Sequence, residues 1–172
     1  AGLTVSDGTL DIAYESDFTP NAGAFAVGTL TGFGILNLTN GVVCTVDEAA
    51  AFGGTVKVGS GASFAQNASS GVMTGDVLVE GGAILVGPAA DEAATVRTTG
   101  RVELPAALTV VLPDIDFAEL NLVESLAVTM AGSNWSFRTV GGTPLDASQF
   151  KVVRTATGVS VRARKGMLLI FR

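Results

Sequence analysis

The stretch VKVGSGASF, residues 56–64, decides the fold, because the chain repeats it with small changes. In each copy two apolar residues stand five and three positions before a glycine, and another apolar residue follows two or three positions after it. The copies are LTVSDGTL (3–10), LNLTNGVV (36–43), VKVGSGASF (56–64) and VLVEGGAIL (77–85). Repeated strand–turn–strand units are typical of chains that stack one structural unit on the next.

The spacing of the repeat lies in the range of stacked β coils. Aligned on their glycines, the copies centre on Gly8, Gly41, Gly61 and Gly82, with gaps of 33, 20 and 21 residues. A weaker fifth copy, VRTTGRVEL, centres on Gly100. We interpret the long first gap as an insertion or a looser coil within residues 15–30.

Apolar residues within the copies alternate with period two, which is the period of a β-strand. We therefore predict an all-β fold, a right-handed parallel β-solenoid over residues 1–125, with its hand taken from the general rule for parallel crossovers. The predicted core ladder is Leu3, Val5, Leu36, Leu38, Val56, Val58, Val77, Val79, Val102 and Leu104. Because Asp7-Gly8 and Asn40-Gly41 are also hairpin-turn signals, a sandwich of antiparallel hairpins is the alternative.

The texture of the sequence changes near residue 126. Five strand-like runs follow, at 126–130, 135–137, 150–153, 159–161 and 167–171, separated by Gly-rich turns. In the fourth run Val159 and Val161 share one face while Ser160 and Arg162 share the other, which is the pattern of a half-buried edge strand. We interpret residues 126–172 as a C-terminal β-rich cap that closes the open end of the solenoid.

Composition indicates a folded domain with an unusual balance of residues. Of 172 residues, 48% are hydrophobic, only 15% are charged and 22 are glycine, and no apolar run approaches the roughly 18 residues of a membrane helix. The chain begins at Ala1, so we expect a mature product or a piece of a longer protein.

Charge divides the chain into two unequal parts. Residues 1–149 carry a net charge of −12, and residues 150–172 carry +6 with no acidic residue. We hypothesise head-to-tail self-association between the acidic body and the basic end, with Arg162, Arg164 and Lys165 in contact with another copy. Nucleic acid is not an expected partner, because the body is acidic and aromatic residues do not alternate with the basic ones.

The residue types present in the chain exclude most known arrangements of catalytic side chains. The chain has no histidine and one cysteine, Cys44, which we expect in the core. The carboxylate pairs Asp47-Glu48 and Asp91-Glu92, and the cluster of Asp114, Asp116 and Glu119, are better explained as solvent-facing turns, although Asp114 and Asp116 could bind calcium or act as an acid pair on a polysaccharide. We predict no catalytic, cofactor-binding or metal-binding residue, and no enzyme.

Trp135 has two interpretations: its ring could form a platform on which a sugar ring stacks, or it could be a core residue. The second is more usual for a lone tryptophan. Trp135 also begins the C-terminal series of runs: an Asn-Trp strand, a Phe-x-Val strand, a Gly-Val-x-Val strand and the final Leu-Ile-Phe-Arg.

Together with the preceding repeats, this series resembles the C-terminal ends of large secreted β-helix surface proteins of the autotransporter-like kind. The resemblance implies an extracellular or cell-surface setting and a structural or adhesive role. A surface glycan is a candidate partner. It carries over no catalytic residue. Two alternatives remain open, a self-assembling extracellular filament subunit and a carbohydrate-binding or carbohydrate-active β-helix.

Overall fold

A computed structural model describes residues 1–14, 24–89, 92–113 and 117–164 of the chain, and these residues form an all-β structure. One short 3-10 turn, η1 (Ala147–Gln149), interrupts the strands in the described part. The strands belong to three sheets, which are described in turn.

Two sheets are built almost wholly from parallel strands. The six-stranded sheet runs in the order β14 (Ala127–Met130), β11 (Arg101–Leu104), β8 (Asp76–Val79), β6 (Thr55–Val58), β4 (Ile35–Thr39) and β2 (Thr9–Ala13). The eight-stranded sheet runs in the order β1 (Gly2–Val5), β3 (Ala24–Gly32), β5 (Val43–Glu48), β7 (Ser63–Gln66), β9 (Ile84–Val86), β12 (Thr109–Leu112), β15 (Ser136–Thr139) and β16 (Pro144–Leu145).

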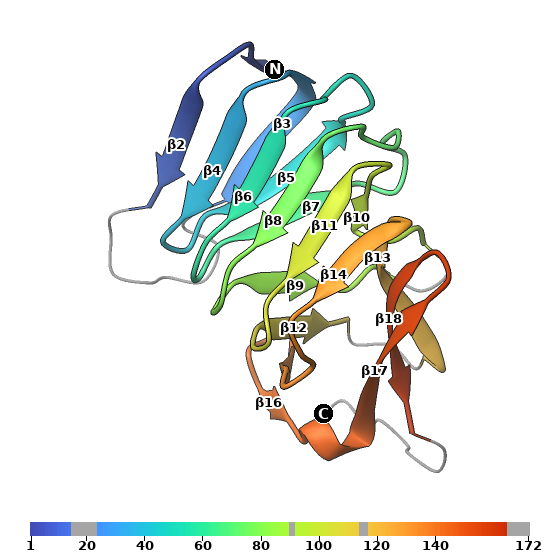
Figure 1. Cartoon of the computed structure of the whole chain (residues 1–172). Helices are drawn as coiled ribbons and strands as arrows, with labels where there is room; N and C mark the ends of the chain where they lie inside the picture. The colour runs from blue at the N-terminus through green and yellow to red at the C-terminus, as the bar shows by residue number, and fades with distance from the viewer. Residues whose placement is uncertain (15–23, 90–91, 114–116, 165–172) are drawn as a thin grey trace.

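The chain alternates between these two sheets from β2 to β9 (Figure 1). Each strand pairs in parallel with the strand two further along the chain, as β4 does with β6 and β5 with β7. Strands that follow one another in the chain therefore lie in different sheets, and the described strands of this region form no antiparallel hairpin. The alternative of an antiparallel sandwich is wrong.

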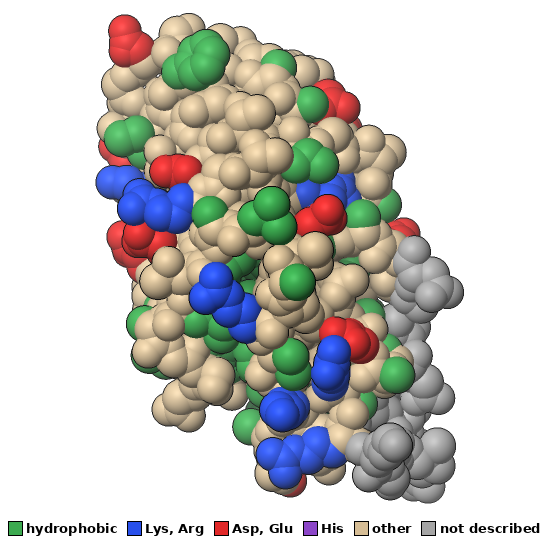
Figure 2. Space-filling view, turned by 45° about the vertical axis from the view of Figure 1, so that its right-hand side comes forward, with side chains coloured by type: hydrophobic (Ala, Val, Ile, Leu, Met, Phe, Trp, Pro, Cys, Tyr) green, Lys and Arg blue, Asp and Glu red, His purple; other side chains and the backbone are tan. Residues whose placement is uncertain are grey.

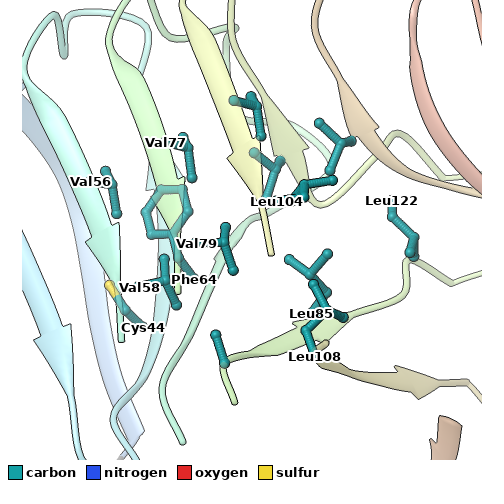
Figure 3. Close-up of a cluster of buried hydrophobic side chains, with 14 of the residues drawn as sticks. Cys44, Val56, Val58, Phe64, Val77, Val79, Leu85, Leu104, Leu108 and Leu122 are labelled. Carbon is teal, nitrogen blue, oxygen red and sulfur yellow. The ribbon is translucent and has the colours of Figure 1, made fainter. Parts of the chain in front are cut away.

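The pairing registers place most of the predicted core ladder as expected. In the six-stranded sheet Leu36 pairs with Val56, Val56 with Val77, and Val77 with Val102, and all four side chains are fully buried. A second column runs from Leu38 through Val58 to Val79. Figure 3 shows that side chains from both parallel sheets, among them those of Val56 and Phe64, point into the same interior.

Leu3 and Val5 do not belong to this ladder, so that part of the prediction is wrong. They lie in β1 of the eight-stranded sheet, opposite Leu30 and Gly32. The places beside Leu36 and Leu38 are taken by Leu10 and Ile12 of β2, because Thr9 pairs with Ile35, 26 residues later. The cause is that Gly8 lies next to the Gly34–Ile35 segment, with the amide of Ile35 donating to the carbonyl of Gly8 at 2.8 Å, and so is not equivalent to Gly41.

The glycines form two corner columns of different kinds. Gly41, Gly61 and Gly82 have positive φ angles of 82°, 73° and 82°, which glycine adopts without strain. The other column consists of Gly34, Gly54, Gly75 and Gly100, where successive units pass so closely that a Cβ would not fit. A Cβ on Gly54 would lie 2.0 Å from the carbonyl oxygen of Gly34, and one on Gly75 would lie 2.2 Å from that of Gly54.

Parallel pairing continues past residue 125, the predicted domain boundary. β14 pairs in parallel with β11, and β15 with β12. Antiparallel pairing begins with β16 on β15 and in the four-stranded sheet, which runs in the order β10 (Val96–Arg97), β13 (Glu119–Glu124), β18 (Gly158–Ala163) and β17 (Phe150–Thr155). The change in pairing therefore does not coincide with residue 125.

β18 was expected at an edge, and this expectation is wrong. It lies inside the four-stranded sheet, with antiparallel partners β13 on one side and β17 on the other. Its polar residues are matched across the strands, since the Ser160 hydroxyl donates to Asn121 Oδ1 at 2.7 Å. The predicted strand at 167–171 lies outside the described residues.

The four-stranded sheet packs against the end of the common core through aromatic side chains. The ring of Phe150 in β17 lies 4.8 Å from that of Phe137 in β15, centroid to centroid, and 6.2 Å from that of Phe117. Both Phe137 and Phe150 are buried. In the described part of the chain no helix is long and apolar enough to cross a membrane.

Candidate binding surfaces

The carboxylates singled out in the sequence do not converge on one site in the described structure. Asp114, Asp116 and Asp91 lie outside the described residues, so the calcium hypothesis is not addressed by the geometry. Among the residues that the structure describes, no three His, Cys, Asp or Glu side chains stand close enough to hold a metal ion. Asp47 instead accepts a hydrogen bond from the amide nitrogen of the Asn67 side chain.

Glu48 and Glu119 each have local partners. Glu48 Oε1 accepts from the main-chain amides of Ala50 at 2.7 Å and Gly71 at 3.3 Å, so it ties two neighbouring turns together. Glu119 Oε2 lies 3.0 Å from Arg162 Nε, and the hydrogen bond from Arg162 lowers the pKa of the Glu119 carboxyl. An ion pair of this kind keeps the carboxyl charged and unsuited to donate a proton at neutral pH.

Cys44 lies in the core, as predicted. Its side chain is fully buried between Phe25 and Phe64, which occupy the paired positions on β3 and β7. Burial raises the pKa of the thiol from 9.0 to about 12. Because the thiolate is the reactive form, a thiol held neutral in this way is inert at neutral pH.

Trp135 is also a core residue and offers no exposed ring for a sugar. It is 3% exposed, and its Nε1–H donates to the carbonyl of Pro105 at 3.3 Å. The residue borders an open depression of about 550 Å³, which is lined mainly by residues from 107–109, 134–137 and 144–147 and whose other apolar walls include Leu108 and Leu145. The polar hydroxyls there, on Thr109 and Ser136, bond to each other at 3.0 Å, and no charged side chain lines the depression.

A buried arginine was missed by sequence reasoning. Arg97 is 3% exposed, and its guanidinium donates to the main-chain carbonyls of Ala94 (3.2 Å), Asn67 (2.7 Å) and Ser70 (2.6 Å). The Arg97 amide donates to Gln66 Oε1 at 2.6 Å. No motif marks this residue, because its partners are main-chain groups that any sequence supplies. Arg97 fastens the segment after β7 to the segment before β10.

Charges are unevenly placed along the stack of strands. Asp7 and Asp11 are exposed near the N-terminal end, and the first basic residue of the chain is Lys57. Lys151, Arg154 and Arg164 are exposed at the other end. On the face shown in Figure 2, Lys and Arg side chains are spread from the middle of the molecule to its lower end, and the uppermost part shows none.

Of the three basic residues predicted to contact another copy, Arg162 is already paired with Glu119. Arg164 is exposed, with its main-chain amide donating to the Gln149 carbonyl at 2.9 Å. Lys165 lies outside the described residues. The described C-terminal end therefore presents Arg164, together with Lys151 and Arg154 of β17, as exposed basic residues besides the ion-paired Arg162.

Large exposed apolar side chains are scattered. Phe33 is 80% exposed, Leu126 79% and Val140 66%. The ring of Phe33 rests on Gly53, where an added Cβ would lie 2.8 Å from Phe33 Cε1. Single exposed apolar residues are normal on protein surfaces and do not by themselves define a site.

No family model, no curated protein and no solved structure matches this chain.

Proposed function

We propose that the chain is a non-catalytic structural or adhesive segment of an extracellular or cell-surface protein. In this proposal the two parallel sheets are faces of one right-handed β-solenoid, and the four-stranded sheet is its C-terminal cap. The single observation that carries the proposal is the pair of aliphatic columns that run without interruption through successive strands of the six-stranded sheet. Such an interior serves length and rigidity, and it leaves the outer faces free for contacts.

Three further features support the proposal. The chain alternates between the two sheets, which is what winding around one interior requires. Phe150 of the four-stranded sheet covers Phe137 at the C-terminal end of the core, as a cap would. Cys44 is buried and its thiol pKa is raised, so it is protected from the oxidants that occur outside a cell. The sequence resemblance to autotransporter-like surface proteins supports the same setting.

One experiment separates this role from that of a carbohydrate-active enzyme. The purified chain is incubated with a panel of polysaccharides, and new reducing ends are measured alongside retention of the chain on the same immobilised polysaccharides. We expect no new reducing ends, with or without retention. Turnover that disappears in Asp114→Asn or Asp116→Asn would overturn the proposal in favour of an enzyme.

A second experiment tests the location. Antibodies raised against the chain are applied to intact cells of the source organism and to the same cells after lysis. We expect labelling of intact cells, because the proposed segment lies outside the membrane. Labelling that requires lysis would contradict the extracellular role and leave the fold unaffected.

A further inference from the structure

The described chain leaves the four-stranded sheet beside the depression that Trp135 borders. β18 runs antiparallel to β17, and just beyond their last pair the Arg164 amide donates to the Gln149 carbonyl at 2.9 Å. Gln149 belongs to η1, whose first residue, Ala147, lines the depression. At residue 164 the chain has therefore passed the start of β17 and lies next to the turn that forms one wall of the depression.

The sequence after residue 164 contains an uninterrupted apolar run. Residues 165–172 read KGMLLIFR, so five consecutive apolar residues, 167–171, follow Lys165-Gly166 and precede Arg172. The run begins three positions after residue 164, and eight extended residues span up to about 26 Å. The run is therefore long enough to extend from η1 across the depression.

The sheet that contains β18 does not offer this run a place next to β18. Both sides of β18 are occupied, by β13 and by β17, so a strand that turned back at Lys165-Gly166 would find no unpaired main chain there. The direction of β18 instead carries the chain alongside η1, which Asp146 alone separates from β16. The path of the described chain thus leads to the depression.

The walls of the depression have the chemistry that suits an apolar segment. Its lining includes Leu108, Trp135, Phe137, Pro144, Leu145 and Ala147, and none of the described lining residues is charged. Pro144 and Ala147 are exposed and Leu145 is half-buried, so this wall has apolar surface left to cover. The hydroxyls of Thr109 and Ser136 bond to each other, so hydrocarbon placed over them leaves that hydrogen bond intact.

We propose that residues 167–171 of this chain bind over the depression, with alternate side chains turned towards Leu108, Leu145 and Ala147. The apolar run leaves water, and the wall formed by β16 and η1 is covered at the same time. The depression is then a contact surface within the chain and not a binding site for a sugar. The inference deepens the proposed cap, on which it rests, by naming the segment that completes it.

The segment of the same copy is favoured over that of a second copy. The main-chain bond to Gln149 fixes residue 164 next to the depression, so a run that starts three residues later is present there at a high effective concentration. A segment from a second copy must displace it and also loses the translational freedom of a separate molecule.

Trp135 provides the first test, because it is the only tryptophan of the chain and borders the depression. In the full chain, Leu168→Asp with Leu169→Asp puts a carboxylate on each side of an extended segment, so one enters the depression whichever side faces it. We expect acrylamide to quench Trp135 fluorescence at least about twofold more strongly, since burying an unpaired carboxylate is costly and expels the segment. Far-ultraviolet circular dichroism checks that the variant keeps its strands.

Arg172→Asp is the matched control for the quenching experiment. It lowers the net charge by the same amount as the double substitution and leaves the apolar run intact. We expect quenching to stay as in the unaltered chain. Quenching that rises equally in Arg172→Asp would show an effect of charge alone and would overturn the inference.

Disulfide formation in the full chain locates the segment. Ala147→Cys places a thiol on the exposed wall and is combined with Leu168→Cys or Leu169→Cys, while the buried Cys44, with its thiol pKa raised to about 12, does not compete. Ala51→Cys, at an exposed alanine in the turn after β5, is the matched control. We expect one Ala147→Cys pair to close within one copy at least about tenfold faster than either Ala51→Cys pair, because a disulfide requires Cα atoms within about 7 Å.

The inference requires both results. Unchanged quenching in Leu168→Asp with Leu169→Asp, or closure of the Ala147→Cys pairs no faster than that of the Ala51→Cys pairs, would overturn it. Disulfides that join two copies would overturn the assignment to the same copy. Neither test involves polysaccharides or cells, so the proposed role can stand when this inference fails, and the reverse also holds.

Discussion

At the scale of single residues, Gly54 shows how closely successive units approach at one corner. A Cβ there would lie 2.0 Å from the Gly34 carbonyl oxygen and 2.8 Å from the Phe33 carbonyl carbon, both of them main-chain atoms that cannot move aside alone. We predict that Gly54→Ala lowers the free energy of unfolding by about 3 kcal/mol, because the methyl group forces neighbouring strands apart. Urea unfolding followed by circular dichroism measures the change.

Gly81→Ala is the matched control for that substitution. A Cβ on Gly81 meets no atom within 4 Å. We therefore expect a change in the free energy of unfolding of no more than about 0.5 kcal/mol. Equal losses in Gly54→Ala and Gly81→Ala would mean that lost backbone freedom, and not close approach, explains the glycines.

Cys44 makes stability depend on alkaline pH. Its pKa is raised from 9.0 to about 12 in the folded chain, so between these values the unfolded chain releases a proton that the folded chain keeps. The unfolded state thus gains stability as pH rises above about 9, and the free energy of unfolding falls with a slope of up to about 1.4 kcal/mol per pH unit.

The measurement compares the unaltered chain with Cys44→Ala by urea unfolding from neutral pH to pH 10. We expect the stability advantage of the unaltered chain to shrink above pH 9, because the variant has no thiol to titrate. A difference between the two proteins that stays constant over the whole range would show that the thiol titrates alike in both states.

At the scale of elements, the local pattern predicts strands better than it predicts which sheet they join. Leu36 and Val56 were assigned to one ladder correctly because the same alternation recurs 20 residues apart and the strands pair in that register. Leu3 and Val5 satisfy the same pattern before Gly8 yet lie in the other sheet. Alternating apolar residues become buried in whichever sheet their strand joins. Only the pairing of a strand with its neighbours decides which sheet that is.

The expectation that β18 is an edge strand was wrong for a related reason. Ser160 and Arg162 have the polarity of an edge strand, but Asn121 and Glu119 on β13 bond to them across the sheet, at 2.7 and 3.0 Å. Partners that distant in sequence leave no local signal. The candidate surfaces follow the same rule: the charge division between the two ends is visible in the sequence, whereas the position of β2 at one end of the described six-stranded sheet depends on topology.

Arg97 shows how a single side chain can hold one element against another. Its guanidinium binds three main-chain carbonyls, on Asn67, Ser70 and Ala94, and these carbonyls would lose their partners if it were removed. We predict that Arg97→Met lowers the free energy of unfolding by about 3 kcal/mol, since buried acceptors are left without donors. Urea unfolding gives the value, and hydrogen exchange locates the loosened segment at 67–72.

Arg101→Met serves as the comparison, because Arg101 is half exposed and pairs with Asp76 and Glu103 at the surface. Exposed pairs contribute at most about 1 kcal/mol. A loss in Arg101→Met as large as that in Arg97→Met would contradict the role given to the buried carbonyl contacts.

At the scale of the whole molecule, each inner strand of the two parallel sheets pairs mainly with the strands before and after it in its own sheet. Stability in such an array is the sum of local terms and of terms between neighbours, so a position's importance depends on where it lies in the stack. Val56 is fully buried with β4 on one side and β8 on the other, while Leu10 is half-buried in β2, which has β4 as its one neighbour among the described strands of its sheet.

We therefore predict that truncating Val56 lowers the free energy of unfolding more than truncating the larger Leu10. Val56→Ala should lower the free energy of unfolding by about 2 kcal/mol, and Leu10→Ala by less than about 1 kcal/mol in the monomer, although it deletes more atoms. Native-state hydrogen exchange should show Val56→Ala lowering protection throughout the parallel sheets and Leu10→Ala lowering it only in β2 and β4. A larger loss for Leu10→Ala than for Val56→Ala would mean that the position of a strand in the stack does not govern the cost of a substitution.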